Sequence, residues 1–409
     1  MKITDASSLA SSSAFAVSAT APTGRRRALA LLAGGALAAP AMVRAAPPAG
    51  PLRIGVIASW SGAYADYGRQ FDAGMAVWLD AHGGRIAGRP VELLRRDVPG
   101  SAPDLARRHA QELVVRERVE LLTGLDFSPN AFAVGAIAAQ AKVPAVVMNA
   151  AASDLTARSP FLVRVSFTVA QVSAPMARWA LRERIASVCT LVADYASGAD
   201  AEAAFAGAFA AGGGQVVASL RVPLATLDFS AYLQRVRDLK PQAVFFFLPS
   251  GQLPTAFLRA WKERGMAESG IRLLATGEAT DDNYLDGIGG LAAGLVTSHH
   301  YSYAHDSQAN RRFVQGFEAR YGSRLRPGYF AVAAHDALAA IDAAFARAGG
   351  AARGEALVEG FRGLRLESPR GPIAIDAATR DIVQTVYIRR TAKRASDGRW
   401  VNVELAPRS

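Results

Sequence analysis

The chain has 409 residues, of which 51% are hydrophobic and 20% are charged, a composition typical of globular proteins and not of disordered chains. Its length predicts more than one compact unit, since single hydrophobic cores stop growing at about 250–300 residues. The single Cys excludes an internal disulfide and any zinc or iron–sulfur site built from several thiolates.

The net charge of +11 raises the question of nucleic-acid binding. Basic pairs such as Arg107-Arg108, Arg311-Arg312 and Arg389-Arg390 are scattered along the chain, mostly among acidic residues on predicted helices. Nucleic-acid binders concentrate such charge on one face, with aromatic residues between the basic ones. We therefore expect no nucleic-acid partner.

Residues 1–45 have the composition of an export signal peptide. Three arginines, Arg25–Arg27, precede a short apolar run over 28–41, and Val43-Arg44-Ala45 offers small residues for cleavage. The arginines are typical of twin-arginine export, although Ala28-Leu29 stands where such signals favour Phe-Leu, so general secretion remains an alternative. No later stretch is expected to span a membrane, and we expect an exported protein that is soluble in the periplasm after signal cleavage.

From Leu52 onward, short β-rich runs alternate with segments of helical periodicity. The first half predicts strands at 53–58, 91–95, 121–125 and 145–148, and helices over 64–81, 103–118 and 130–141. After a run at 161–165, the second half predicts strands at 187–193, 215–222, 243–248, 271–275 and 295–298, and helices over 169–184, 200–211, 229–239 and 253–264. The last part predicts helices over 310–321, 330–348 and 355–361 and β segments at 373–375, 383–389 and 400–403. This alternation predicts an α/β fold with two doubly wound parallel sheets, because parallel strands are joined by helical crossovers.

Open α/β sheets bind ligands beyond the carboxyl ends of their strands. The first such end is Ser61-Gly62-Ala63, which stands between a strand and a helix start, where backbone N–H groups favour a carboxylate. Tyr64 and Tyr67 follow directly, and the alternative is a plain turn with buried tyrosines. Three further aromatic residues are candidates for cavity walls, with core packing as the default alternative, namely Tyr301, Tyr329 and Phe330.

Several segments together resemble the type I periplasmic binding proteins of ABC importers for branched-chain amino acids, amides, urea and aromatic acids. These segments are distributed over nearly all of the chain after residue 51. In chain order they are Ile54-Gly55-Val56-Ile57, Ser61-Gly62-Ala63-Tyr64-Ala65-Asp66-Tyr67-Gly68, Gly83-Gly84, Ile86-Ala87-Gly88-Arg89-Pro90-Val91-Glu92-Leu93, Val143-Pro144, Asn149-Ala150-Ala151-Ala152, Leu155-Thr156, Val192-Ala193-Asp194-Tyr195, Asp228-Phe229-Ser230 with Leu233, Thr280-Asp281-Asp282, Arg370-Gly371-Pro372 and Ile375-Asp376. The resemblance implies two lobes joined by a three-strand hinge that close on a solute. It places 51–169 and 300–366 in lobe 1, and 170–299 and 367–409 in lobe 2.

The resemblance also implies roles for residues of lobe 1. The aromatic residue at the Tyr67 position packs on the solute, and Ser128 matches a hydroxyl that grips the solute carboxylate. Asn149, Ala150 and Ala151 match a strand end that supplies backbone groups and a Thr hydroxyl. Ala151 stands in the place of that Thr, which argues against an α-amino acid ligand.

In lobe 2 the matching positions are Tyr195, Ser197 and Glu278. Ser197 stands where the family usually has Tyr, which leaves room for a bulkier ligand such as an aromatic acid. Glu278 falls where amino-acid binders place a carboxylate for the ammonium group, and a desolvated charge must be paired. The alternative for Glu278 is a solvated carboxylate on a loop.

The resemblance implies a receptor that captures a branched-chain amino acid or an aromatic acid and delivers it to an inner-membrane ABC permease as a monomer. No cofactor, metal or catalytic group is expected. His299, His300 and His305 are interpreted as a solvated hinge segment instead of a metal site, and Cys189 as an inert buried thiol. The rival functions are a periplasmic ligand sensor of the same fold and, less favoured, a hydrolase, for which nucleophile and metal motifs are missing.

Overall fold

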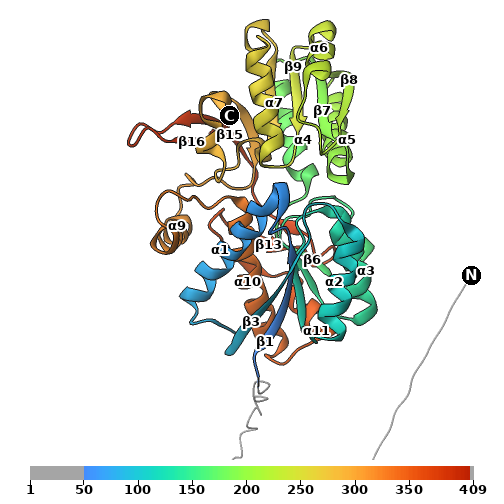
Figure 1. Ribbon diagram of the computed structural model, residues 1–409, viewed down its shortest axis with the longest axis vertical. Helices are drawn as coiled ribbons and strands as arrows, with labels where there is room; N and C mark the ends of the chain where they lie inside the picture. The colour runs from blue at the N-terminus through green and yellow to red at the C-terminus, as the bar shows by residue number, and fades with distance from the viewer. Residues whose placement is uncertain (1–49, 406–409) are drawn as a thin grey trace, which may run out of the picture. The chain divides into compact units, whose positions relative to one another are not determined.

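The computed structural model describes residues 50–405, which form an α/β fold with two large sheets (Figure 1). Most strand pairs in both sheets are parallel, and helices cover both faces of each sheet. The predicted fold class is therefore confirmed. The predicted export signal, residues 1–45, lies outside the described residues.

The first sheet has six strands in the order β2-β3-β1-β4-β5-β6. Its strands are β1 (Leu52–Ala58), β2 (Arg85–Ile86), β3 (Arg89–Asp97), β4 (Leu121–Gly124), β5 (Ala145–Val147) and β6 (Leu162–Arg164). The helices that follow these strands are α1 (Ala65–Ala81), α2 (Pro103–Val115) and α3 (Ser128–Ala141). All pairs are parallel except the β2–β3 hairpin, which is antiparallel.

Alternate residues of β1 enter two different cores, as expected for a strand buried on both faces. Ile54 and Val56 pack in the cluster that contains α1 and α10 (Tyr329–Ala348), whereas Ile57 packs in the cluster of α2 and α3. The first sheet is thus enclosed by α1 and α10 on one face and by α2 and α3 on the other (Figure 1).

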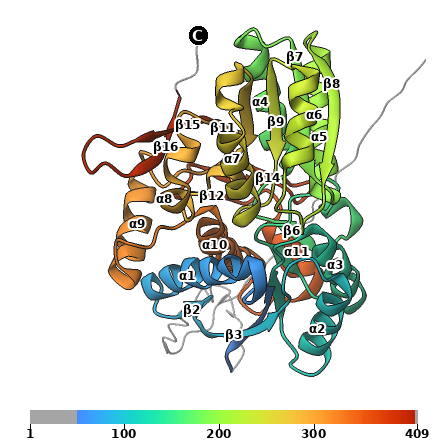
Figure 2. The same cartoon turned by 45° about the horizontal axis from the view of Figure 1, so that its top comes forward.

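The second sheet has seven strands in the order β16-β15-β11-β10-β9-β7-β8. Its strands are β7 (Ser187–Ala193), β8 (Gln215–Val222), β9 (Ala243–Phe247), β10 (Arg272–Thr276), β11 (Val296–His299), β15 (Tyr387–Lys393) and β16 (Trp400–Glu404). The helices are α4 (Val169–Arg182), α5 (Ala196–Ala211), α6 (Ser230–Leu239), α7 (Gln252–Glu263) and the short α8 (Leu285–Ile288). Helices α4 and α5 cover one face, and α6 and α7 cover the other (Figure 2).

The chain passes between the two sheets three times, from β6 to α4, from β11 to α9 (Gln308–Tyr321), and from β14 (Ile382–Val383) to β15. These passages correspond to the expected three-strand hinge. A bidentate ion pair connects the end of β6 with the residue before β14, because Arg164 Nε and Nη2 lie 2.7 and 2.9 Å from the carboxylate oxygens of Asp381. The Arg164 side chain is completely buried.

A third sheet, of three short antiparallel strands, corrects the predicted division of the chain. It consists of β12 (Arg365–Leu366), β13 (Ile373–Ile375) and β14, and follows α11 (Gly354–Phe361). The sequence assigns all of 367–409 to lobe 2, which is wrong for β13 and β14. Their buried isoleucines pack in the core of α1 and α10, and only β15 and β16 pair with the second sheet.

Helix α5 begins four residues before the predicted start at 200, which places Ser197 in its first turn. The reason lies in Gly198, since a Cβ there would collide with the carbonyl oxygen of Ala193 at the end of β7. Gly198 is therefore required by the close approach of helix and strand, and it does not interrupt the helix.

Helix α10 is the one helix within residues 50–405 whose length and composition would allow it to cross a membrane. The sequence was expected to contain no such stretch after the export signal. In the structure, 72% of its most apolar window is buried. It packs against α1 and α11 and is a core helix of the first sheet.

Candidate ligand-binding cavity

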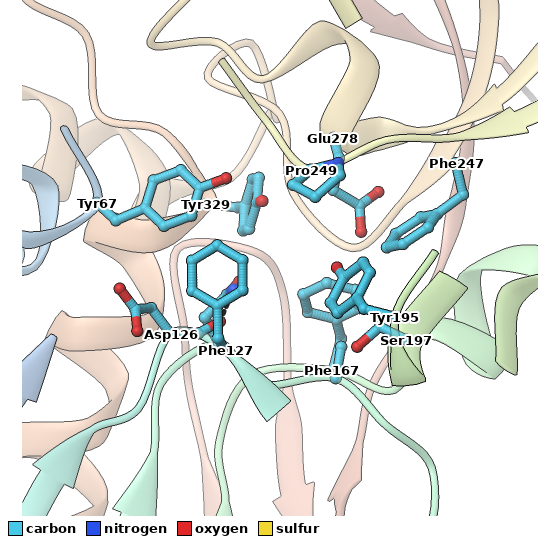
Figure 3. Close-up of a pocket in the computed structure, with 12 residues that line it drawn as sticks. Tyr67, Asp126, Phe127, Phe167, Tyr195, Ser197, Phe247, Pro249, Glu278 and Tyr329 are labelled. Atoms are coloured by element: carbon cyan, nitrogen blue, oxygen red, sulfur yellow. Dashed lines mark hydrogen bonds between the residues drawn. The ribbon is translucent and has the colours of Figure 1, made fainter. Parts of the chain in front are cut away.

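A cavity lies where the carboxyl ends of strands from both sheets meet (Figure 3). Its walls come from the segments directly after β4, β5, β6, β7, β9 and β10 and from the helices α1 and α10. The lining residues are Tyr67, Asp126, Phe127, Asn149, Ala151, Phe167, Tyr195, Ser197, Phe247, Pro249, Glu278 and Tyr329. The free space between these residues is small, about 20 Å³, little more than one water molecule needs, so a ligand enters only when the walls move apart.

Six aromatic rings form most of the wall. On the first-sheet side, the ring centroids of Tyr67 and Phe127 lie 6.0 Å apart and those of Phe167 and Tyr329 lie 5.9 Å apart. On the second-sheet side, the rings of Tyr195 and Phe247 are stacked at 6.1 Å. Such pairs favour flat, apolar ligands, because rings pack well in stacked and edge-on arrangements.

The hydroxyl groups of two of these tyrosines connect the sheets through Ser250, which follows β9. The Tyr67 hydroxyl donates to the Ser250 carbonyl oxygen at 2.8 Å, and the Tyr329 hydroxyl lies 3.0 Å from Ser250 Oγ. Ser250 Oγ in turn donates to the carbonyl oxygen of Glu278. Burial raises the pKa of both tyrosines well above the ordinary value, so their hydroxyls stay neutral donors.

Glu278 lies in the 3-10 turn after β10 and is 3% exposed, so the alternative of a solvated loop carboxylate is wrong. Burial raises the pKa of this carboxyl to about 7. Among residues 50–405, neither carboxylate oxygen has a hydrogen-bond partner. Figure 3 shows the carboxylate directed toward the rings that line the cavity.

His299 Nε2 lies 3.8 Å from the nearer carboxylate oxygen of Glu278, but the two do not form an ion pair. Burial, together with the nearby Arg389 and Arg370, lowers the pKa of His299 well below its ordinary value, so the ring is neutral. His299 and His300 are both fully buried, which corrects the prediction of a solvated hinge segment. They pack against the rings of Phe167 and Tyr329. Within the described chain, no three His, Cys, Asp or Glu side chains gather closely enough to hold a metal ion.

Two helix starts approach each other at the cavity, α3 from the first sheet and α5 from the second. Ser128 Oγ and Ser197 Oγ are 2.9 Å apart, and Ser128 Oγ also accepts a hydrogen bond from the amide of Ala152. The first N–H groups of a helix have no partner within the helix, and the helix dipole favours a negative charge there. Hydroxyl and amide donors from both sheets therefore meet at one place, which suits a carboxylate.

Asp126 and Asn149 contribute side chains to the cavity that the sequence did not predict. Asp126 is not among the predicted site residues, and Asn149 was expected only as part of a strand end that supplies backbone groups. Asp126 follows β4 and is 3% exposed, and burial raises the pKa of its carboxyl to about 6. Its Oδ2 accepts from the amide of Ser59 at 2.9 Å and from Ser59 Oγ at 2.5 Å. Asn149 Nδ2 donates to the carbonyl oxygen of Asp126 at 2.7 Å.

The predicted anion-binding loop lies outside this cavity. Ser61, Gly62 and Ala63 are exposed and do not line the cavity, and the amide and hydroxyl of Ser61 both donate to Asp97. The Asp97 carboxylate thus satisfies the donors that were expected to meet a ligand, and the prediction for Ser61 is wrong in this arrangement. Tyr64 is partly buried and supports the wall, because its ring packs against those of Tyr67 and Phe127.

The predicted strand-end residues are divided between the cavity and its surroundings. Tyr67, Asn149, Ala151, Tyr195, Ser197 and Glu278 line the cavity. Ser128 lies just behind it and contacts Ser197. Ala150 is buried, and its amide and carbonyl are bound by Leu125 and Arg164.

Four further lining residues were missed as site residues: Phe127, Phe167, Phe247 and Pro249. Tyr329, for which core packing was the favoured alternative, also lines the cavity. The signal that could have found Phe127, Phe247 and Pro249 is their place at or directly after the end of a predicted strand.

Comparisons with known proteins agree with this architecture. The family model described as "Periplasmic binding protein" matches residues 51–398. A Leu/Ile/Val-binding protein homolog 6 of Brucella melitensis is 41% identical over 370 residues, which cover 90% of this chain and 95% of that protein.

Two solved structures from Rhodopseudomonas palustris are similar throughout. A solute binding protein of an ABC transporter from strain BisB5, in complex with 3,4-dihydroxybenzoic acid, is 42% identical with a TM-score of 0.83. Another from strain HaA2, in complex with p-hydroxybenzoic acid, is 37% identical with a TM-score of 0.84. Each alignment covers 87% of this chain and 96% of the other.

Proposed function

Because the chain belongs to the periplasmic binding protein family and is the solute-binding component of an ABC transporter, we propose that its ligand is a hydroxylated aromatic carboxylic acid. The observation that carries the proposal is the wall of six aromatic rings around a narrow cavity. A flat ring between such walls buries apolar surface on both faces, which an aliphatic side chain does less completely.

The ligand carboxylate would lie at the facing starts of α3 and α5. There one hydroxyl proton of the Ser128–Ser197 pair is free, since the other is donated within the pair, and it can donate to the carboxylate together with the first helical amides. Glu278 would accept a hydrogen bond from a ring hydroxyl, which satisfies an oxygen that has no partner among the described residues. Between them, the six rings would hold the aromatic ring of the ligand.

The ligands named for the two Rhodopseudomonas palustris proteins, 3,4-dihydroxybenzoic and p-hydroxybenzoic acid, support this choice. The replacements noted in the sequence point the same way. Ser197 is small and lines the cavity, and Ala151 brings no hydroxyl to it. Both features leave room for a ring and remove a contact expected for an α-amino acid.

A branched-chain amino acid is the second candidate. The unpaired, buried Glu278 carboxylate could equally receive an ammonium group, and a relative at 41% identity is named as a Leu/Ile/Val-binding protein homolog. The aromatic wall and Ala151 argue against it.

We further propose that the protein is exported to the periplasm, acts as a soluble monomer, and delivers its ligand to an inner-membrane permease without chemical change. Closure of the two lobes on the ligand would let the permease distinguish loaded from unloaded receptor. A ligand sensor of the same fold is the alternative. A loaded receptor that stimulates ATP hydrolysis by its permease would support transport, and one that engages only a signalling partner would support sensing.

The test is a thermal-shift screen followed by calorimetric titration. The panel contains benzoate, 4-hydroxybenzoate, 3,4-dihydroxybenzoate, leucine, isoleucine and valine. A ligand that binds only the folded protein raises stability by about 2.7 kcal/mol at one hundred times its Kd. We expect a rise in Tm with the hydroxybenzoates only; a rise with leucine, isoleucine and valine alone would overturn the proposal.

A further inference from the structure

A close contact joins the two lobes beside the cavity. Asp281, which follows the 3-10 turn after β10, lies against Gly328, the residue before α10. Both residues are buried. A Cβ on Gly328 would lie 3.1 and 3.2 Å from Cγ and Oδ2 of Asp281, and closer still to Oδ1. Such an approach is possible only for a residue without a side chain.

The Asp281 carboxyl takes the place of a helix cap. The N-cap residue of α10 is Gly328, which has no side chain, and the first N–H groups of a helix lack partners within it. Burial and the neighbouring Asp282 raise the pKa of the Asp281 carboxyl to about 8. Hydrogen bonds from the backbone amides of Asn283 and Tyr329 act to lower the same pKa. Tyr329 is the first residue of α10, so this helix receives its cap from the other lobe.

A buried glutamine binds both sides of this contact. Gln70 of α1 is 3% exposed. Its Oε1 accepts a hydrogen bond from the amide of Gly328 at 2.8 Å, and its Nε2 donates to Asn283 Oδ1 at 2.9 Å. Asn283 lies two residues after Asp281, so one side chain of the first lobe holds the start of α10 against the segment of the second.

The contact connects two segments that line the cavity. Glu278 precedes Asp281 by three residues and Tyr329 directly follows Gly328, and both Glu278 and Tyr329 line the cavity (Figure 3). Asp281, Gly328 and Gln70 do not line it. Because the free space is about 20 Å³, a ligand enters only when the lobes part. A contact between the second lobe and the start of α10 must then part with them.

We propose that the contact between Asp281 and Gly328 is made only when the lobes close, so that it sets how tightly the protein holds its ligand without touching it. Asp281 and Gly328 are then positioning residues for the closed form, and the bare backbone of Gly328 is what permits closure. The inference rests on the proposed function for its probe ligand, but not for the contact itself. A contact made only after encounter slows the release of a ligand and hardly affects its association.

The test is a double-mutant cycle of Gly328→Ala and Asp281→Ala, measured with 4-hydroxybenzoate by calorimetry and by stopped-flow fluorescence. The φ and ψ of Gly328, −89° and −176°, suit alanine, so the collision with Asp281 and not the backbone opposes the substitution. We expect Gly328→Ala to raise the Kd about tenfold, mainly through faster dissociation. Asp281→Ala alone should raise it about fivefold, because α10 loses its cap. In the Asp281→Ala background, Gly328→Ala should change the Kd by less than about twofold.

The matched control is Gly207→Ala in α5, where a Cβ would meet no atom of another segment within 4 Å. It should leave the Kd unchanged. The Tm of unliganded Gly328→Ala should stay close to that of wild type, because the open form avoids the collision. An unchanged Kd in Gly328→Ala, an equal loss of affinity in both backgrounds, or a large fall in this Tm would overturn the inference. Failure of wild type to bind any aromatic acid would overturn the proposed function alone, and the cycle repeated with leucine would then decide the inference.

Discussion

The hydroxyl oxygens of Ser128 and Ser197 lie 2.9 Å apart, although one begins α3 on the first sheet and the other lies in the first turn of α5 on the second. A contact of this length between the two sheets requires the helix starts to face each other. It also places donors from both sheets around one point, so that an anion bound there would be held from both sides.

Replacing either serine should therefore weaken binding of an aromatic acid. Hydrogen bonds to a charged group contribute about 1.5–3 kcal/mol, so we expect Ser128→Ala or Ser197→Ala to raise the Kd by roughly tenfold or more. Calorimetric titration measures the change. The control is Ser153→Ala, whose hydroxyl bonds to Asp200 but which does not line the cavity. Unchanged affinity in both Ser128→Ala and Ser197→Ala would place the carboxylate elsewhere.

The stacked pair Tyr195 and Phe247 predicts a preference for flat ligands. Phe247→Leu keeps an apolar side chain but removes the ring, and aromatic pairs are worth about 0.5–1.5 kcal/mol beyond the area that they bury. We expect a three- to tenfold loss of 4-hydroxybenzoate affinity, with less effect on an aliphatic acid. Phe132→Leu, at a ring that packs under Arg158 away from the cavity, is the control. Equal effects of the two substitutions would contradict a ring-binding role for Phe247.

Burial of Glu278 predicts a specific dependence of stability on pH. Its pKa rises from 4.5 to about 7 on folding, so its contribution to stability is fully present below pH 4.5 and is lost as the pH rises through 7. The shift corresponds to about 3 kcal/mol. Between pH 4.5 and 8, the free energy of unfolding of Glu278→Gln should therefore rise relative to wild type by an amount of that order, as measured by urea denaturation.

Asp126 and Asp281, whose pKa values burial also raises, titrate in both proteins and cancel in this difference. The exposed Glu263→Gln is the matched control and should follow wild type at every pH. A constant difference between Glu278→Gln and wild type across this range would contradict the predicted ionisation.

The buried pair of Arg164 and Asp381 predicts a loss of stability when one partner is removed. Asp381→Asn leaves the fully buried guanidinium without its charge partner, which typically costs about 3–5 kcal/mol. We expect a lower Tm. The ligand affinity, measured at a temperature at which the variant is still folded, should change little. Glu359→Gln, in an exposed pair with Arg362, should change stability by less than about 1 kcal/mol. Similar Tm values for the two variants would show that the buried pair is not needed for stability.

Much of the fold could be predicted from the sequence, because strands buried on both faces are continuous apolar runs and the helices between them have clear periodicity. The limits of β7 agree with the prediction at both ends. Helix α5 was placed too late because Ser197 and Gly198 resemble a loop, and only the contact with β7 shows why a glycine is needed there. The third sheet was missed because strands of two or three residues carry almost no pattern.

The cavity could be predicted in part. The family resemblance led to Tyr195, Ser197 and Glu278, which all line it. The strand-end rule failed for Ser61, because the competing carboxylate of Asp97 comes from the end of β3, and contacts between distant segments are not visible in a sequence. Phe167 follows β6 without any polar signal, and an aromatic residue there cannot be distinguished from core.

Cys189, the single cysteine of the chain, is completely buried in β7, and burial raises the pKa of its thiol to about 11. At neutral pH it should therefore react slowly with maleimides. Cysteines introduced at the exposed Val115 and Leu227 could then carry a pair of fluorophores without prior removal of the native thiol. A fluorescent sensor for the ligand could therefore be built on the natural sequence without replacing Cys189.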